Sequence, residues 1–134
     1  MNINIKTKNI VLNDALKFWV EEKVGELGRV LGKFKKNDEF EGGKDKIEIE
    51  VEIGKVTKSR RKGEIFRAEL QLYLPKKRLR VVSRNVDLRT AIVEARNELN
   101  REIRRYKGKR LARARKWARK AKFRATLPKF LRRG

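Results

Sequence analysis

The chain of 134 residues contains no cysteine and no histidine, and it has only two prolines. Without cysteine there is no disulfide framework, no thiol nucleophile and no thiolate metal site. Without histidine the chain lacks the usual general base and the commonest transition-metal ligand. A phosphate-binding glycine loop is also missing, because "GELGRVLG" lacks the Lys-Ser/Thr ending of that motif. We therefore expect no enzyme activity, no cofactor and no small-molecule substrate.

Long hydrophobic runs are missing as well. No apolar stretch approaches the roughly 20 residues that a membrane-spanning helix needs. The first residues, "MNINIKTKNI", contain no extended apolar core of a signal peptide. We expect the protein to reside in the cytoplasm and not to depend on a membrane.

Positive charge is what the sequence has in excess. Lys and Arg number 39 against 17 Asp and Glu, a formal charge of +22. The excess is uneven, because no acid follows Glu102 and residues 103–134 carry 15 basic side chains. A field of this sign and density selects polyanions. Nucleic acid is the leading candidate, and an anionic membrane surface is the second.

The spacing of apolar residues divides residues 1–107 into predicted strands and helices. Strict alternation in "KIEIEVEIGKV" and in "IFRAELQLYL" predicts two half-buried strands, while "NINIKTKN" and "KRLRVVSRN" predict shorter ones. Apolar residues at helical spacing from Leu16 to Phe34 predict one helix of about five turns, with Asn13 as its N-cap. Asp87 is the expected N-cap of a last helix, whose apolar stripe runs from Leu88 to Tyr106.

This order of elements predicts the fold class. The sequence β-α-β-β-β-α, with one-sided strands and two amphipathic helices, indicates an α+β fold with a four-stranded sheet and both helices packed on one face. The first strand must join the sheet across a helical crossover, so we expect one parallel strand pair. We assign residues 1–108 to this domain and residues 109–134 to a strongly basic C-terminal extension.

The last helix separates its charges. On a helical wheel with about 100° per residue, one flank is basic and the other carries Glu94, Glu98 and Glu102. The basic flank comprises Arg89, Arg96, Asn100, Arg104 and Lys107. A solvated face with ordinary ion pairs is the plainer interpretation. Because the basic row continues into the acid-free end, we favour a phosphate-binding surface.

The extension "KRLARARKWARKAKFRATL" allows two interpretations. Ala, Arg and Lys favour a helix, whereas a basic arm that orders only on binding is the alternative. We expect Arg110, Arg113 and Lys116 to contact phosphates and Trp117 to stack on a base. Phe123 and Phe130 are further aromatic side chains available to RNA. The basic turn at residues 58–63 is either a soluble hairpin tip or a second phosphate contact.

The segments "KVTKSRRKGEIFRAELQL" and "DLRTAIVEARNELNREIRRYKGK", together with the order of elements, resemble the ribosome hibernation-promoting factors, also called ribosome-associated inhibitor or sigma-54 modulation proteins. The resemblance covers residues 1 to about 109. It implies a fold like that of a double-stranded RNA-binding domain. It also implies binding to the 30S-type small ribosomal subunit, between head and body, where the protein would cover the positions of messenger RNA and transfer RNA.

The resemblance also implies which residues bind ribosomal RNA. On the last helix these are Arg101, Arg104, Arg105, Lys107 and Lys109, and on the first helix Lys23 and Arg29. Long members of the family carry a C-terminal dimerisation domain of short strands that pairs two ribosomes, and the end of this chain has no alternating strand pattern, so the sequence leaves open whether two ribosomes are brought together. The basic extension has no counterpart in the resemblance.

The sequence therefore predicts a ribosome hibernation factor that blocks messenger and transfer RNA and so inhibits translation under stress. Three alternatives remain open. The first is a general nucleic-acid-binding protein that uses the same charges without a ribosomal site. The second is a membrane-surface protein anchored by the extension, and the third is a permanent ribosomal protein.

Overall fold

The computed structural model describes residues 1–32, 47–56 and 63–127. The stretch "KKNDEFEGGKD" at residues 35–45, whose composition predicts a loop, lies outside these residues. So do Phe34, Phe130 and most of the basic turn at 58–63. The chain divides into two compact units, Met1–Ile103 and Arg104–Gly134. Helix α3 (Leu88–Thr126) contributes residues to both of them.

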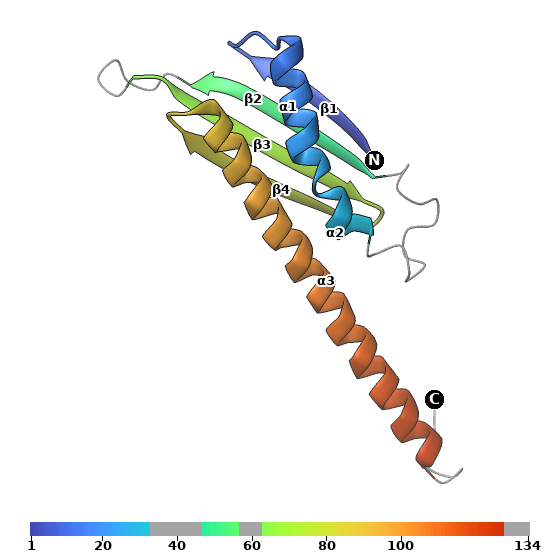
Figure 1. Ribbon diagram of the computed structural model, residues 1–134. Helices are drawn as coiled ribbons and strands as arrows, with labels where there is room; N and C mark the ends of the chain where they lie inside the picture. Colours follow the sequence, from blue (N-terminus) through green and yellow to red (C-terminus); the bar gives the residue numbers. More distant parts are fainter. Residues whose placement is uncertain (33–46, 57–62, 128–134) are drawn as a thin grey trace. The chain divides into compact units, whose positions relative to one another are not determined.

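The first unit is a two-layer α+β domain (Figure 1). Its sheet has the order β1-β2-β3-β4, formed by β1 (Asn2–Lys8), β2 (Glu48–Val56), β3 (Ile65–Leu74) and β4 (Lys77–Asn85). Strand β1 pairs with β2 in parallel, and the other two pairs are antiparallel. The predicted fold class and the single parallel pair are thus confirmed.

The first predicted helix is divided in two, which corrects the expectation of one helix of five turns. Helix α1 spans Asp14–Gly25 and helix α2 spans Gly28–Gly32. Between them the backbone tightens, with the Leu27 amide donating to the Val24 carbonyl at 3.1 Å. Gly25 and Gly28 lie at this break, and glycine is the weakest helix former after proline. The apolar stripe nevertheless stays buried at Val24 and Leu31.

Both predicted N-caps are present. The Asn13 side chain accepts a hydrogen bond from the Leu16 amide at 2.7 Å and so begins α1. Asp87 accepts hydrogen bonds from the Thr90 amide at 2.9 Å and the Thr90 hydroxyl at 2.6 Å. These hydrogen bonds lower the pKa of Asp87 below its ordinary value. Each cap satisfies a backbone donor that the first helical turn leaves open.

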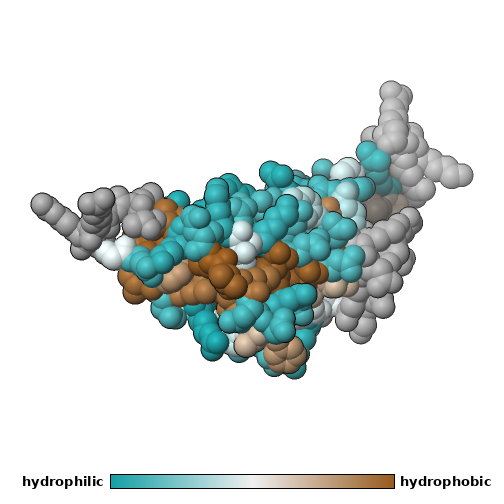
Figure 2. All heavy atoms as spheres, turned by 90° about the horizontal axis from the view of Figure 1, so that it is seen from above, coloured by the Kyte–Doolittle hydropathy of each residue, from teal (hydrophilic) through white to brown (hydrophobic). Residues whose placement is uncertain are grey.

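The core lies between one face of the sheet and the helices. Residues 88–103 of α3 bury their apolar stripe in the first unit, as predicted. The buried side chains of the two layers include Val20, Val24, Ile49, Val51, Ile53, Leu70, Leu72, Ile92, Leu99 and Ile103. Figure 2 looks down on the molecule and shows a band of hydrophobic side chains bordered by hydrophilic ones. The outer surfaces of both layers are therefore available for polar interactions.

Candidate RNA-binding surface

The beginning of α3 is attached firmly to strand β4. The Ser83 hydroxyl donates to one carboxylate oxygen of Glu94 at 2.8 Å, and the Asn85 amide donates to the other at 3.2 Å. One of the three acids predicted on the acidic flank is therefore engaged with the sheet. These contacts fix the direction in which residues 88–103 present their basic side chains.

Three predicted RNA-binding residues of the first unit have carboxylate partners within that unit. Arg96 forms an ion pair with Glu26, at the end of α1, and its side chain is only 20% exposed. Lys23 lies 3.6 Å from the same carboxylate group. The Arg101 guanidinium donates to Glu98 at 2.6 Å. Phosphate binding at these positions has to compete with carboxylates that are already in place.

Arg89 is held by an aromatic ring instead. Its guanidinium carbon lies 5.2 Å from the centroid of the Trp19 ring, within range of a cation–π interaction. The contact joins α1 to the first turn of α3. Arg89 remains exposed. Arg29, on the short helix α2, is exposed as well.

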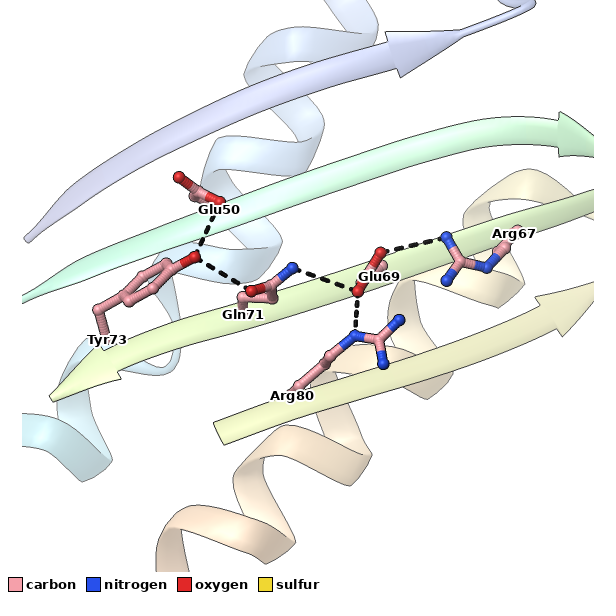
Figure 3. Close-up of polar contacts among 6 residues, drawn as sticks. All are labelled: Glu50, Arg67, Glu69, Gln71, Tyr73 and Arg80. Atoms are coloured by element: carbon pink, nitrogen blue, oxygen red, sulfur yellow. Dashed lines mark hydrogen bonds and ion pairs between the residues drawn. The ribbon is translucent and has the colours of Figure 1, made fainter. Parts of the chain in front are cut away.

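The outer face of the sheet neutralises much of its own charge (Figure 3). Glu69 on β3 forms ion pairs with Arg67, at 3.2 Å, and with Arg80 of β4. Gln71 donates to Glu69 at 3.2 Å, and the Tyr73 hydroxyl lies 3.1 Å from Glu50 and 3.0 Å from Gln71. This network continues from β2 to β4. A face on which carboxylates alternate with guanidinium groups is poorly suited to a polyanion.

Glu69 is the buried acid of this network, with an exposed fraction of 6%. Burial raises the pKa of Glu69, but hydrogen bonds and charges from Arg80 and Arg67 oppose it, and the net pKa lies below its ordinary value. The carboxylate therefore stays ionised and holds both arginines in place. The alternating acids of β2 do not form a metal site, since no group of three metal-ligating acids occurs among the described residues.

The second unit has the opposite character. Residues 104–126 belong to helix α3, which ends at Thr126; the alternative of a basic arm that orders only on binding stays open. This stretch carries twelve Lys and Arg and no acid. The predicted contacts Arg104, Arg105, Lys107, Lys109, Arg110, Arg113, Lys116 and Trp117 all lie on it. Most of them are exposed, and Lys107 and Arg110 are half-buried.

Large apolar side chains also reach solvent in the second unit. Trp117 is 70% exposed, Phe123 65% and Leu111 40%. The ammonium of Lys120 lies 5.5 Å from the Trp117 ring, and the Arg110 guanidinium lies 5.4 Å from the Tyr106 ring. The sequence analysis named Phe123 as available to RNA but gave it no direction relative to Trp117. The two residues are six positions apart, and this spacing puts their rings on different sides of the helix.

The fold and the charge distribution define a class of protein: a small α+β domain whose last helix is strongly cationic. Within this class, the chain belongs to the family described as sigma 54 modulation protein / S30EA ribosomal protein, whose sequence profile matches residues 3–111. This membership makes it a ribosome-associated protein. Residues 112–134 lie beyond the matched range.

Solved structures support the assignment. The chain is similar to the Protein Y N-terminal domain of Thermus thermophilus, with a TM-score of 0.59 and 26% identity over 79% of this chain and 99% of that one. It shares its fold with a ribosomal subunit interface protein from Coxiella burnetii, with a TM-score of 0.57 and 15% identity over 81% and 99% of the two chains. No curated protein sequence matches. Among the described residues, no helix is both long and apolar enough to span a membrane.

Proposed function

We propose that this protein is a hibernation factor that binds the small ribosomal subunit in its decoding channel and excludes messenger and transfer RNA. The family match supplies the ribosome as partner. The observation that carries the channel assignment is the acid-free cationic helix at residues 104–126, which follows in the chain a domain where Arg67, Arg96 and Arg101 pair with carboxylates. Such a helix suits a site walled by ribosomal RNA phosphates.

In this proposal, cations of α3 contact phosphates. The exposed ones are Arg89, Arg101, Arg104, Arg105, Lys109, Arg113 and Lys116, and the half-buried ones are Lys107 and Arg110. Three residues outside this group also bind ribosomal phosphates in the proposal. Lys23 and Arg96 do so when a phosphate takes the place of the Glu26 carboxylate, and Arg29 adds a contact from α2. The protein acts by occupancy in the cytoplasm and carries out no chemistry.

Binding that depends on many phosphates must be sensitive to salt. If about eight phosphates are neutralised, the logarithm of the affinity falls with the logarithm of the salt concentration with a slope of about −6 to −7. A general nucleic-acid-binding protein with the same helix predicts a similar slope on any RNA or DNA. Salt dependence alone therefore does not distinguish a hibernation factor from a general nucleic-acid-binding protein. Competition with unrelated RNA and DNA does distinguish them.

The test is co-sedimentation of the full chain with small ribosomal subunits at about 150 mM salt, near physiological ionic strength, in an excess of unrelated duplex RNA and DNA. The proposal expects one protein per subunit, and displacement when messenger RNA and initiator transfer RNA are added together. Binding that the unrelated duplexes abolish identifies a general nucleic-acid-binding protein. Binding that survives both additions places the site outside the decoding channel.

A further inference from the structure

The cations at residues 111–126 cover more than half of the circumference of the helix. With about 100° between successive residues, the seven Lys and Arg occupy an arc of roughly 200°. They are Arg113, Arg115, Lys116, Arg119, Lys120, Lys122 and Arg124. A helix lying on a flat surface presents a strip of about 100° to it. An arc twice that width fits a partner that rises on both sides of the helix.

The remaining side of the helix carries no charge. This side, about 160° wide by the same geometry, is bordered by Leu111 and Trp117. Between these two lie Ala114, Ala118, Ala121 and Ala125. An alanine surface offers little apolar area to a membrane, because interfacial helices insert Trp, Phe and Leu along one face. Here the third large apolar residue, Phe123, lies on the opposite side.

Phe123 lies at the centre of the cationic arc. Its position falls midway between Lys122 and Arg124 around the helix as well as along the chain, and its ring is 65% exposed. Exposing an aromatic ring among cations is unfavourable in water, where apolar surface is better buried. Against RNA, the same ring meets bases while the cations beside it meet phosphates.

We infer that residues 111–126 insert into a groove of folded RNA with Phe123 foremost. Arg115 and Lys122 reach the phosphates of one wall, and Arg113 and Arg124 reach those of the other. Phe123 stacks on a base at the floor, and the alanine side faces out of the groove. The inference rests on the proposed function in one respect, which is that it takes RNA as the partner.

The shape of the helix limits which RNA can accept it. An α-helix with side chains is about 10–12 Å across, whereas the major groove of regular A-form RNA is too deep and narrow for side chains to read. Bulges and internal loops expose unstacked bases and interrupt the regular helix. The partner is therefore an irregular RNA helix and not a perfect duplex.

The first test compares two aromatic residues on the same helix. Full-length Phe123→Ala and Trp117→Ala variants are titrated against small ribosomal subunits and against an RNA hairpin with an asymmetric internal loop. Alanine is the best helix former, so neither variant loses affinity by melting the helix, and circular dichroism confirms this. We expect Phe123→Ala to weaken binding to both RNAs by about tenfold, the loss of one base stack. Trp117→Ala should cause a clearly smaller loss.

The second test compares the two walls. The double variant Arg115→Gln/Lys122→Gln and the double variant Arg113→Gln/Arg124→Gln each remove two cations from opposite sides of the arc. Both should reduce the salt slope by about 1.4 to 1.8, the contribution of two phosphates. A loss confined to one double variant describes a helix lying on a flat surface and overturns the inference.

Other outcomes overturn it as well. If Trp117→Ala loses as much RNA affinity as Phe123→Ala, the RNA covers the alanine side of the helix as well, and the assigned orientation is wrong. Equal affinity for the looped hairpin, a perfectly paired hairpin and duplex DNA excludes selection of an irregular groove. Binding to phosphatidylserine vesicles that Trp117→Ala abolishes assigns the helix to a membrane surface. Failure of messenger and transfer RNA to displace the full chain from small subunits refutes the proposed function alone, because the hairpin measurements still report on the groove.

Discussion

Ending the chain at Arg110 removes the groove-binding segment and leaves the unit Met1–Ile103 complete. Four of the lost cations, Arg113, Arg115, Lys122 and Arg124, are the ones assigned to phosphates on the two walls. Four phosphates contribute about 3 to the salt slope. At about 150 mM salt, this corresponds to a loss of two to three orders of magnitude in affinity, or roughly 3–4 kcal/mol. The full chain should therefore bind with a slope of about −6 to −7 and the shortened chain with about −3 to −4.

The assay is a titration of small ribosomal subunits with labelled protein at several salt concentrations. A chain of full length in which the seven cations of residues 111–126 are replaced by Gln is the matched control, because it keeps the helix length and removes only the charge. It should show the same reduced salt slope as the shortened chain, and it should bind about tenfold more tightly because Phe123 remains. Thermal unfolding of both variants should leave the transition of the first unit unchanged. The same affinity and the same slope for full and shortened chains would refute the assignment of this segment to RNA.

Three further predictions concern the fold. Asn13→Ala should destabilise the first unit by about 1 kcal/mol, because the N-cap of α1 is lost, and should lower its melting temperature by several degrees. Glu69→Gln should cost about 1–3 kcal/mol, since Arg67 and Arg80 lose a charged acceptor. Because the pKa of Glu69 is lowered on folding, its stabilisation is complete above the unfolded-state value and is lost as pH falls through the folded-state value. The difference from the wild type in urea unfolding should therefore be largest near neutral pH and shrink in acid. The helicity of the second unit should rise with added salt, by screening of like charges at i,i+3 and i,i+4 positions, while RNA affinity falls. Circular dichroism that shows no gain with salt would contradict this.

Much of the fold can be predicted from local sequence patterns. Alternation in "KIEIEVEIGKV" identifies a strand with one buried face because each pleat turns successive side chains to opposite sides. Asn13 and Asp87 identify the starts of two helices because their side chains satisfy amides three residues later. The break between α1 and α2 was not predicted, because the apolar stripe continues through Gly25 and Gly28 and stays buried on both sides of the break.

The candidate site was less accessible to sequence reasoning. A helical wheel places Arg96 in a continuous basic row, but it contains no information on side chains distant in the chain. In the structure Arg96 pairs with Glu26, 70 residues earlier, and Arg89 lies on the Trp19 ring. Such contacts depend on how α1 packs beside α3. The predicted cations of the second unit were easier to identify, because no acid follows Glu102 and helical spacing alone decides their directions.

The two units therefore divide the work of recognition for a physical reason. In the first unit, pairs such as Arg96–Glu26 and Arg67–Glu69 compensate charge while a hydrophobic core fixes the shape. In the second unit no acidic side chain is available, and repulsion between neighbouring cations opposes the helix in water. Phosphates remove that repulsion, so RNA binding and helix stability favour each other. Since phosphate contacts carry affinity without sequence information, the proposal expects most of the strength of binding from the second unit. The choice of site then rests on the folded surface of the first unit together with the irregular groove that Phe123 would select.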